Sequence, residues 1–224
     1  MKRNILFLTV LLGANCLSAQ INETVSITPG YTNETYYTLD NGNEVSTVRN
    51  DWDIAFASNG LGGASSTIRI NGGMGTNCWV YNNDITQWNS VDTTGFDWTT
   101  NQLVNSDVSW ATGAFDNKIA SSAFDLGWGT YNLVTHAVEG DRIFIIKLAN
   151  GDYKKMVVNS LIGGVFTFKY ADLNGSNEIS ASLTKSDYLD KNFGYYSIQN
   201  ELTIDREPVS DSWDILFTKY VTDL

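Results

Sequence analysis

Histidine and cysteine, which often hold metals or serve as catalytic bases and nucleophiles, are nearly absent from this chain. Its 224 residues include one histidine, His136, and two cysteines, Cys16 and Cys78. A zinc site needs about four nitrogen, sulfur or oxygen ligands, and no His-Glu-x-x-His or Cys-x-x-Cys spacing occurs. The Gly-x-Ser-x-Gly stretch of a nucleophile elbow is missing as well. The composition therefore argues against zinc and against an enzyme of the Ser-His-Asp type.

Long apolar runs are missing too, apart from a short one at the N-terminus. Lys2 and Arg3 precede the apolar residues 5–12, and Ala19 supplies a small residue for cleavage. This layout is typical of a cleavable secretory signal, and the apolar run is too short to span a bilayer. Residues 1–19 are predicted to be the signal peptide, which favours export over a lipid anchor on Cys16. The mature chain then keeps only Cys78, so no internal disulfide is expected, and we interpret this thiol as a small buried hydrophobe.

Basic residues are outnumbered, with 14 Lys and Arg against 25 Asp and Glu and a net charge of −11. Such a surface repels polyanions, which argues against a nucleic-acid partner and against anionic lipid. No later segment is long and apolar enough to cross a membrane. The charge also suits an extracellular protein that needs only to stay soluble.

Strand signals dominate the rest of the chain. Asn150-Gly151 lies between the apolar runs 142–148 and 152–158, which predicts a hairpin with positive φ at both turn residues. Gly163-Gly164 then leads into a third run, 165–170, in which alternate aromatic residues share one face. These three runs predict an antiparallel meander within an all-β fold.

Three further stretches complete the prediction. Residues 36–39 and 44–48 flank a polar turn and predict another hairpin. Residues 52–56 alternate apolar and small or polar side chains, which predicts a half-buried strand. Residues 84–127 are polar with scattered aromatics and no helical period, so we expect long loops pinned by aromatic side chains. Loops on a rigid scaffold are common places for binding.

One internal repeat is visible. Tyr36-Tyr37 followed by Trp52-Asp53-Ile54 matches Tyr195-Tyr196 followed by Trp213-Asp214-Ile215. Two copies are too few for a solenoid, so we expect two equivalent strands in the two halves of one sheet assembly. The repeated aspartates, Asp53 and Asp214, also raise the possibility of paired carboxylates for glycoside cleavage. Solvated or turn-bonding aspartates explain the same pattern.

His136 itself admits several interpretations. As a catalytic base it would need a positioned nucleophile and an orienting carboxylate, and the sequence marks neither. As a structural residue it would occupy the turn before the strand that starts near Arg142. As an iron ligand it would need a second donor, for which Met74 is available in a glycine-rich loop. Met156 lies in a meander strand and is predicted to belong to the core.

Several stretches together, in this order, resemble the HmuY family of haem-binding proteins. They are Trp52-Asp53-Ile54-Ala55-Phe56, Ile68-Arg69-Ile70-Asn71-Gly72-Gly73, Gly127-Trp128-Gly129-Thr130-Tyr131 with Thr135-His136, residues 143–158, Phe166-Thr167-Phe168-Lys169-Tyr170 and residues 213–220. The resemblance implies a hand-shaped β domain that is secreted or lies on the outer-membrane cell surface of Bacteroidetes. It implies haem as the cofactor, a role in iron acquisition as a haemophore, and, for the flavobacterial branch, secretion by the type IX route.

The chain departs from the family pattern in the residues available as iron ligands. Family members commonly use two axial histidines, some relatives use methionine, and this chain offers only His136. The resemblance therefore implies His136 as the axial ligand, with Met74 as the second candidate. Residues 20–224 are predicted to form a single HmuY-like domain, whose natural chain could continue past Leu224.

The sequence thus predicts an exported binding protein for haem or porphyrin rather than an enzyme, with aromatic loops between residues 74 and 136 forming the grip. A haem-carrying protein is a further possible partner. The first alternative is a non-catalytic surface interaction module on the same fold, with the haem site lost. A glycan-active enzyme is the third.

Overall fold

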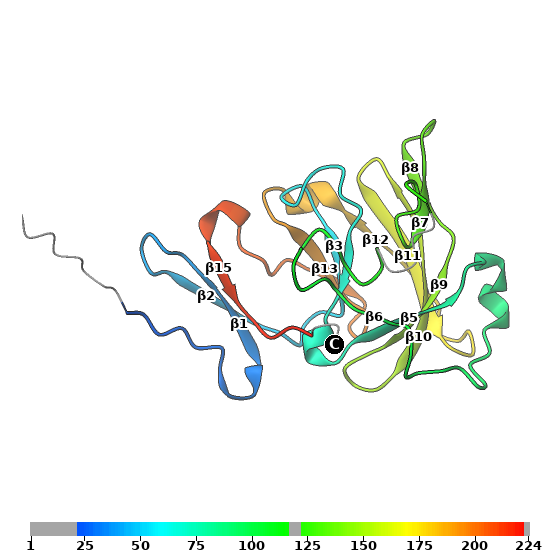
Figure 1. Ribbon diagram of the computed structural model, residues 1–224, viewed down its shortest axis with the longest axis horizontal. Coiled ribbons are helices and arrows are strands. Elements are labelled where there is room, and N and C mark those ends of the chain that lie inside the picture. The colour runs from blue at the N-terminus through cyan, green and yellow to red at the C-terminus, as the bar shows by residue number, and fades with distance from the viewer. Residues whose placement is uncertain (1–21, 117–121, 222–224) are drawn as a thin grey trace, which may run out of the picture.

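The computed structural model describes residues 22–116 and 122–221, and these form three antiparallel sheets, shown in Figure 1. This confirms the all-β class. The predicted signal peptide lies outside the described residues. In the part of the chain that is described, no helix is long and apolar enough to cross a membrane. The helical elements are short 3-10 turns: η1 (Pro29–Tyr31), η2 (Gly72–Met74), η3 (Ile85–Ser90), η4 (Lys185–Tyr188) and η5 (Ser210–Ser212).

The largest sheet has eight strands, and its centre is the predicted meander. The strand order along its main path is β12-β11-β10-β9-β5-β6, and β8 pairs with β10 and with β7. The strands of this sheet are β5 (Asn77–Asn82), β6 (Gln102–Leu103), β7 (Gly129–Asn132), β8 (Ala137–Gly140), β9 (Ile143–Lys147), β10 (Tyr153–Ile162), β11 (Val165–Asp172) and β12 (Ile179–Thr184). The antiparallel pairing of β9 with β10 and of β10 with β11 confirms the meander.

The turn at Asn150-Gly151 differs from the prediction in one respect. Gly151 has φ +95°, but Asn150 is not among the residues with positive φ. The Gly151 N–H donates to the Leu148 carbonyl at 2.9 Å, and the Leu148 N–H donates to the Asp152 carbonyl at 2.8 Å. The expectation of a two-residue turn is therefore wrong. Its longer loop needs only one left-handed residue, which glycine supplies without a steric penalty.

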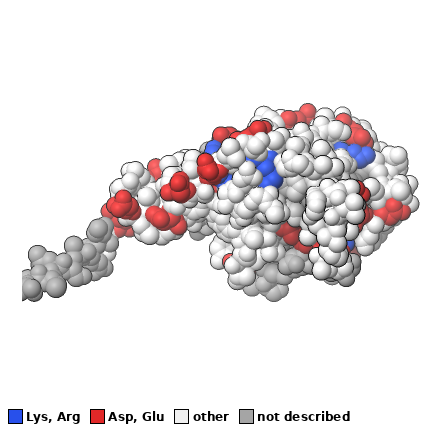
Figure 2. Space-filling model, turned by 90° about the horizontal axis from the view of Figure 1, so that it is seen from above, with Lys and Arg blue, Asp and Glu red and all other residues white. Residues whose placement is uncertain are grey.

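Two smaller sheets stand beside the large one. The first has the order β14-β13-β3-β4 and the second the order β15-β1-β2. Their strands are β1 (Asn33–Tyr37), β2 (Glu44–Val48), β3 (Ile54–Ala57), β4 (Ile68–Ile70), β13 (Phe193–Ser197), β14 (Leu202–Ile204) and β15 (Ile215–Phe217). The pairing of β1 with β2 confirms the predicted N-terminal hairpin. In Figure 2 the end of the molecule that carries this hairpin bears many of the visible acidic side chains.

The main core lies between the four-stranded and the eight-stranded sheets. Phe56 of β3 lies against Phe166 and Phe168 of β11, with ring centroids 4.9 Å apart in both pairs. Met156 belongs to this core, as predicted, and so does Cys78, whose pKa is raised by burial. Burial of this aromatic and aliphatic surface is the main force that holds the sheets together.

Strand β3 is more deeply buried than its alternating pattern indicates. All four residues of the strand are buried, and Asp53 just before it is 0% exposed. The face opposite the main core is covered by a second apolar cluster that contains Ala55, Ala57, Phe193 and Tyr195. The prediction of a half-buried strand is therefore wrong, because a second layer of side chains covers the face that was expected to meet solvent.

The long polar segment after β5 consists mainly of loops, as predicted. Among its described residues the regular elements are η3 and the two-residue strand β6. Aromatic side chains pin these loops to the large sheet: Trp98 lies edge-on to Trp79 at 5.4 Å and to Tyr153 at 4.9 Å. Phe115 is fully buried against Phe144, with ring centroids 4.5 Å apart.

The internal repeat forms a crossed arrangement of strands. The Tyr-Tyr strand of the first copy, β1, pairs with the Trp-Asp-Ile strand of the second copy, β15. The Tyr-Tyr strand of the second copy, β13, pairs with the Trp-Asp-Ile strand of the first, β3. Each of the two sheets therefore contains one strand from each copy, and the equivalent strands β3 and β15 lie in different sheets, which corrects the expectation of one sheet assembly. Each strand pair therefore joins a strand from the N-terminal part of the chain to a strand from the C-terminal part.

The two crossings have the same register. Tyr37 lies opposite Ile215, and Tyr196 lies opposite Ile54. The tyrosine before each of these lies edge-on to the tryptophan of the other copy, since the ring centroids of Tyr36 and Trp213 and of Trp52 and Tyr195 are both 5.0 Å apart. The repeated sequence therefore encodes a repeated strand pair with the same register and the same aromatic contact.

Candidate functional site

The β7–β8 hairpin carries His136 in its turn. The side chain of Asn132 accepts hydrogen bonds from the N–H groups of Val134 at 2.9 Å and Thr135 at 3.2 Å. The His136 N–H donates to the Asn132 carbonyl at 2.9 Å, and His136 has φ +54°. An asparagine that bonds its own turn in this way is a common device for closing a chain reversal. His136 is thus a turn residue, as in the structural interpretation, but its turn precedes β8 rather than β9.

The imidazole of His136 also has a specific partner. The Nδ1 atom lies 2.7 Å from the hydroxyl oxygen of Tyr131, and the contact is exposed. If Nδ1–H donates to that oxygen, the lone pair of Nε2 is free to bind a metal. Histidines that ligate metals commonly donate their other ring N–H to an oxygen in this manner. Sequence reasoning missed Tyr131 as a partner, although its position beside the single histidine was a visible signal.

Exposed apolar side chains lie in the same turn as His136 and at the neighbouring hairpin end. Leu133 is 60% exposed and Val134 is 88% exposed, both at the tip of the hairpin. Leu161 lies opposite Val138 in the pairing of β10 with β8, so the next residue of β10, Ile162, follows towards the same tip. Ile162 is 55% exposed. The neighbouring hairpin tips, residues 133–136 and 162–165, therefore combine an imidazole with exposed apolar surface, and we call them the tip site.

The second predicted ligand, Met74, is not part of the tip site. It ends η2, between β4 of the four-stranded sheet and β5, and its N–H donates to the Asn71 carbonyl at 3.0 Å. In Figure 1 the β7–β8 hairpin lies at the upper right and the segment around residue 74 lies low in the centre, beside the C-terminus. The structure therefore does not bring His136 and Met74 together. Nor does any group of three or more His, Cys, Asp or Glu among the described residues suit a metal ion.

The repeated aspartates have structural roles. Asp53 is fully buried, and its carboxylate accepts hydrogen bonds from the Ile198 N–H at 2.8 Å and the Gln199 N–H at 3.2 Å. Asp214 accepts from the Leu39 N–H at 2.7 Å. Because Asp53 does not reach solvent, these two residues do not form the pair of accessible carboxylates that glycoside cleavage requires. Of the two earlier explanations for the aspartates, turn bonding is the one that the structure shows.

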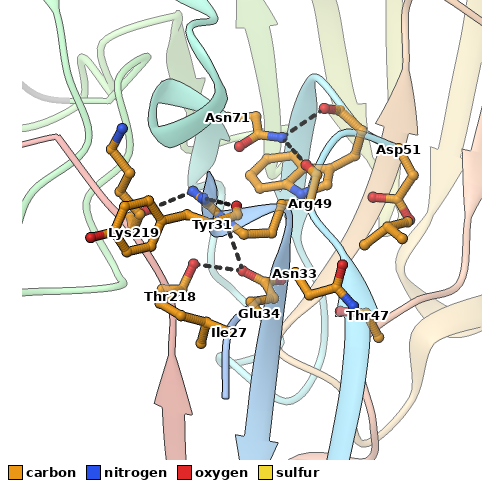
Figure 3. Close-up of polar contacts among 12 residues, drawn as sticks. Ile27, Tyr31, Asn33, Glu34, Thr47, Arg49, Asp51, Asn71, Thr218 and Lys219 are labelled. Carbon is orange, nitrogen blue, oxygen red and sulfur yellow. Dashed lines mark hydrogen bonds and ion pairs between the residues drawn. The ribbon is translucent and has the colours of Figure 1, made fainter. Parts of the chain in front are cut away.

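A charged network lies where the two small sheets meet, and Figure 3 shows it. The guanidinium of Arg49 donates to the carbonyls of Tyr31 at 2.8 Å and Lys219 at 2.6 Å. Glu34 accepts from the Thr218 hydroxyl at 2.7 Å and lies 3.9 Å from Arg49 Nε. Burial lowers the pKa of Arg49, and the negative charge of Glu34 partly restores it.

Asn71 ties this network to η2. Its side-chain amide donates to the carbonyls of Arg49 at 2.6 Å and Trp52 at 2.9 Å. A cavity of about 310 Å³ opens beside the network, lined in part by Arg49, Asn71 and Gly73. Sequence reasoning missed this cavity because its walls come from segments that are far apart in the chain.

Comparison with known proteins identifies the family of this chain. The family model described as HmuY protein matches residues 30–170. Neither a curated protein nor a solved structure matches the chain significantly. HmuY proteins are in general haem-binding proteins of the cell surface. The matched region includes the four-stranded sheet's β3 and β4, the tip-site histidine and the meander, and the chain belongs to the HmuY family.

Proposed function

We propose that this protein binds haem at the tip site, with Nε2 of His136 as an axial ligand of the iron. The observation that carries the proposal is the 2.7 Å contact between the Tyr131 hydroxyl and His136 Nδ1, since an Nδ1–H that donates to this hydroxyl leaves the Nε2 lone pair available for the metal. Histidine is among the side chains that commonly ligate haem iron. Membership of the HmuY family leads us to expect haem as the ligand, and the exposed position of His136 supports the tip site as its binding site.

The apolar surface of the tip site supports the same proposal. A porphyrin is a large flat apolar ring, and its burial against Leu133, Val134 and Ile162 would be favourable. These three side chains are exposed in the free protein. A Cβ added to Gly163 or Gly164 in the neighbouring tip would meet nothing within 4 Å, so a flat ligand meets little obstruction there.

His136 is the single histidine of the chain, so it would be the one imidazole that holds the iron. We propose that the chain is exported by the signal at residues 1–19 and acts at the cell surface as a haemophore, by the type IX route expected for its branch of the family. It holds or transfers haem and catalyses no reaction. A haem-carrying protein is a suitable second partner.

Titration with hemin tests this proposal. Wild-type protein should shift and sharpen the Soret band at one equivalent of hemin, and His136→Ala should abolish that change. Tyr131→Phe should weaken binding by about fivefold, because it removes one hydrogen bond that orients the imidazole. Met74→Ala should behave as the wild type.

Three outcomes discriminate among the alternatives. Loss of the Soret change in Met74→Ala as well as in His136→Ala would favour the His136–Met74 pair and overturn ligation by His136 alone. A wild-type Soret change in His136→Ala would place haem elsewhere. Featureless spectra for the wild type would leave the non-catalytic interaction module, in which the same exposed tips contact a macromolecule.

A further inference from the structure

The cavity of about 310 Å³ has walls from three parts of the molecule. One wall is the stretch from Leu216 to Val221 at and after β15, and another is formed by β3, β4 and η2. The third is the loop that runs from Gln102 to Trp110. Its volume lies at the lower end of the range for small-molecule sites, roughly 300–1,000 Å³. The cavity lies at the crossing of the two repeated strand pairs and does not include residues of the tip site.

The charged side chains around the cavity are largely engaged by the protein itself. Arg69 donates to the carbonyls of Ser109 and Trp110, both at 3.1 Å, and to those of Ser106 and Thr112, both at 3.2 Å. Its guanidinium therefore holds the 106–112 loop in place as a wall. Arg49 and Glu34 are similarly engaged in the network of Figure 3. Two exposed residues of opposite charge, Asp107 and Lys219, also line the cavity, so they add no net charge.

Neutral polar groups remain available. The side-chain amide of Gln102 donates to Asn77 Oδ1 at 2.9 Å. Gln102 Oε1 and Asn77 Nδ2 have no partner among the described residues, so an acceptor and a donor stand side by side on the wall.

Two residues that line the cavity each have one buried polar atom without a partner. Thr76 is 1% exposed, and its hydroxyl makes no hydrogen bond within the described chain. The indole N–H of Trp52 is likewise buried without a partner. Neither atom has accessible surface, so neither faces the cavity, and hydrogen bonds to a ligand would come from the partly exposed side-chain amides of Gln102 and Asn77.

Aromatic surface forms the other part of the lining. Trp110 is 38% exposed and Tyr220 is 63% exposed, and both line the cavity. Trp110 lies 5.7 Å from Trp213 and 6.1 Å from Phe193, ring centroid to ring centroid, so two neighbouring aromatic rings pack against the indole. Aromatic faces beside neutral donor and acceptor groups suit a ring that is apolar on one face and carries hydroxyls at its edge.

We propose that this cavity binds one neutral pyranose sugar, either free or at the end of a glycan. The sugar ring lies against Trp110, and the pair formed by Gln102 and Asn77 bonds two adjacent hydroxyls, one as a donor and one as an acceptor. A charged sugar is disfavoured because the guanidinium groups on the wall already have partners. This site does not depend on haem binding, since it shares no residue with the tip site.

Ligand-observed saturation-transfer NMR tests the proposal with glucose, galactose, mannose, N-acetylglucosamine and an oligosaccharide that ends in the best of these. At least one monosaccharide should show saturation transfer and quench tryptophan fluorescence on titration. Stronger binding of the oligosaccharide than of its terminal sugar would identify a glycan as the source. Equal binding would identify the free sugar.

Matched variants locate the site. Gln102→Ala should weaken binding by about fivefold, the effect of one lost hydrogen bond, and Trp110→Ala should weaken it further. Trp110→Phe keeps an aromatic face and should retain part of the affinity. Two control variants should leave sugar binding unchanged. They are Gln87→Ala, at an exposed position on η3 that does not line the cavity, and His136→Ala.

The sugar-binding proposal can fail independently of the haem-binding proposal. Absence of saturation transfer from every sugar, or equal affinity in wild type, Gln102→Ala and Trp110→Ala, overturns the sugar site. Competition between hemin and the sugar would overturn the claim that the two sites are separate. A hemin titration that gives no Soret change bears only on the tip site.

Discussion

The two copies of the repeat offer a stability experiment with an internal control. Asp53 and Asp214 occupy equivalent positions, and each accepts a hydrogen bond from the main-chain N–H two residues after the second tyrosine of the other copy. Their surroundings differ, because Asp53 is fully buried and Asp214 is exposed. The same substitution at both sites therefore isolates the effect of burial on one hydrogen-bonding arrangement.

The expected magnitudes follow from the partners left behind. Asp53→Ala leaves the buried N–H of Ile198 and the partly buried N–H of Gln199 without an acceptor. At about 1–3 kcal/mol for a buried group and less for a partly buried one, the loss should be about 2–4 kcal/mol. Asp214→Ala leaves the N–H of Leu39, which is 64% exposed and can bond water, so the loss should be about 0.5 kcal/mol.

Urea denaturation followed by tryptophan fluorescence measures both losses. In thermal unfolding, the melting temperature of a domain of this size should fall by roughly 10 °C in Asp53→Ala and by about 2 °C in Asp214→Ala. Asp53→Asn keeps one acceptor oxygen and should lie between Asp53→Ala and the wild type. Equal losses at the two aspartates, or a loss below about 1 kcal/mol for Asp53→Ala, would refute the argument from buried donors.

Three further predictions concern other buried polar or titratable groups. Arg206 is 8% exposed and pairs with Glu34, so Arg206→Met should cost about 3–5 kcal/mol in the free energy of unfolding, and adding Glu34→Leu should restore part of it. Burial raises the pKa of Asp116 from 3.8 to about 7, so the folded state holds the proton more tightly. The free energy of unfolding should therefore fall as pH rises between these two values, and Asp116→Asn should flatten that slope in urea titrations at several pH values. Cys78 is fully buried, so the folded protein should resist thiol reagents, and Cys78→Ser should lower stability by about 1–3 kcal/mol, measured by urea denaturation.

One part of the candidate site could be identified from the sequence, and another part could not. The single histidine was found because it is the only imidazole in the chain. Its partner Tyr131 is five residues away, but the contact exists only because the hairpin turn folds the histidine back over β7. Met74 was a plausible second donor by chemistry alone, and only the coordinates show that η2 belongs to another part of the molecule.

The sequence by itself determined the local pairings of this protein. Alternating apolar residues and glycine-containing turns specify the hairpins of β1 with β2 and of β9 with β10, because strands that are neighbours in sequence pair with a small loss of chain entropy. The repeated Tyr-Tyr and Trp-Asp-Ile segments also determined that two equivalent strand pairs exist.

Only the tertiary structure decided which copies pair. The paired residues of the crossed arrangement are 178 positions apart for Tyr37 and Ile215 and 142 for Ile54 and Tyr196, and nothing in their local sequence distinguishes this from pairing within each copy. The same crossing buries both faces of β3 and brings the walls of the cavity together. Long-range contacts of this kind depend on the packing of whole sheets, which a local pattern of side chains does not contain.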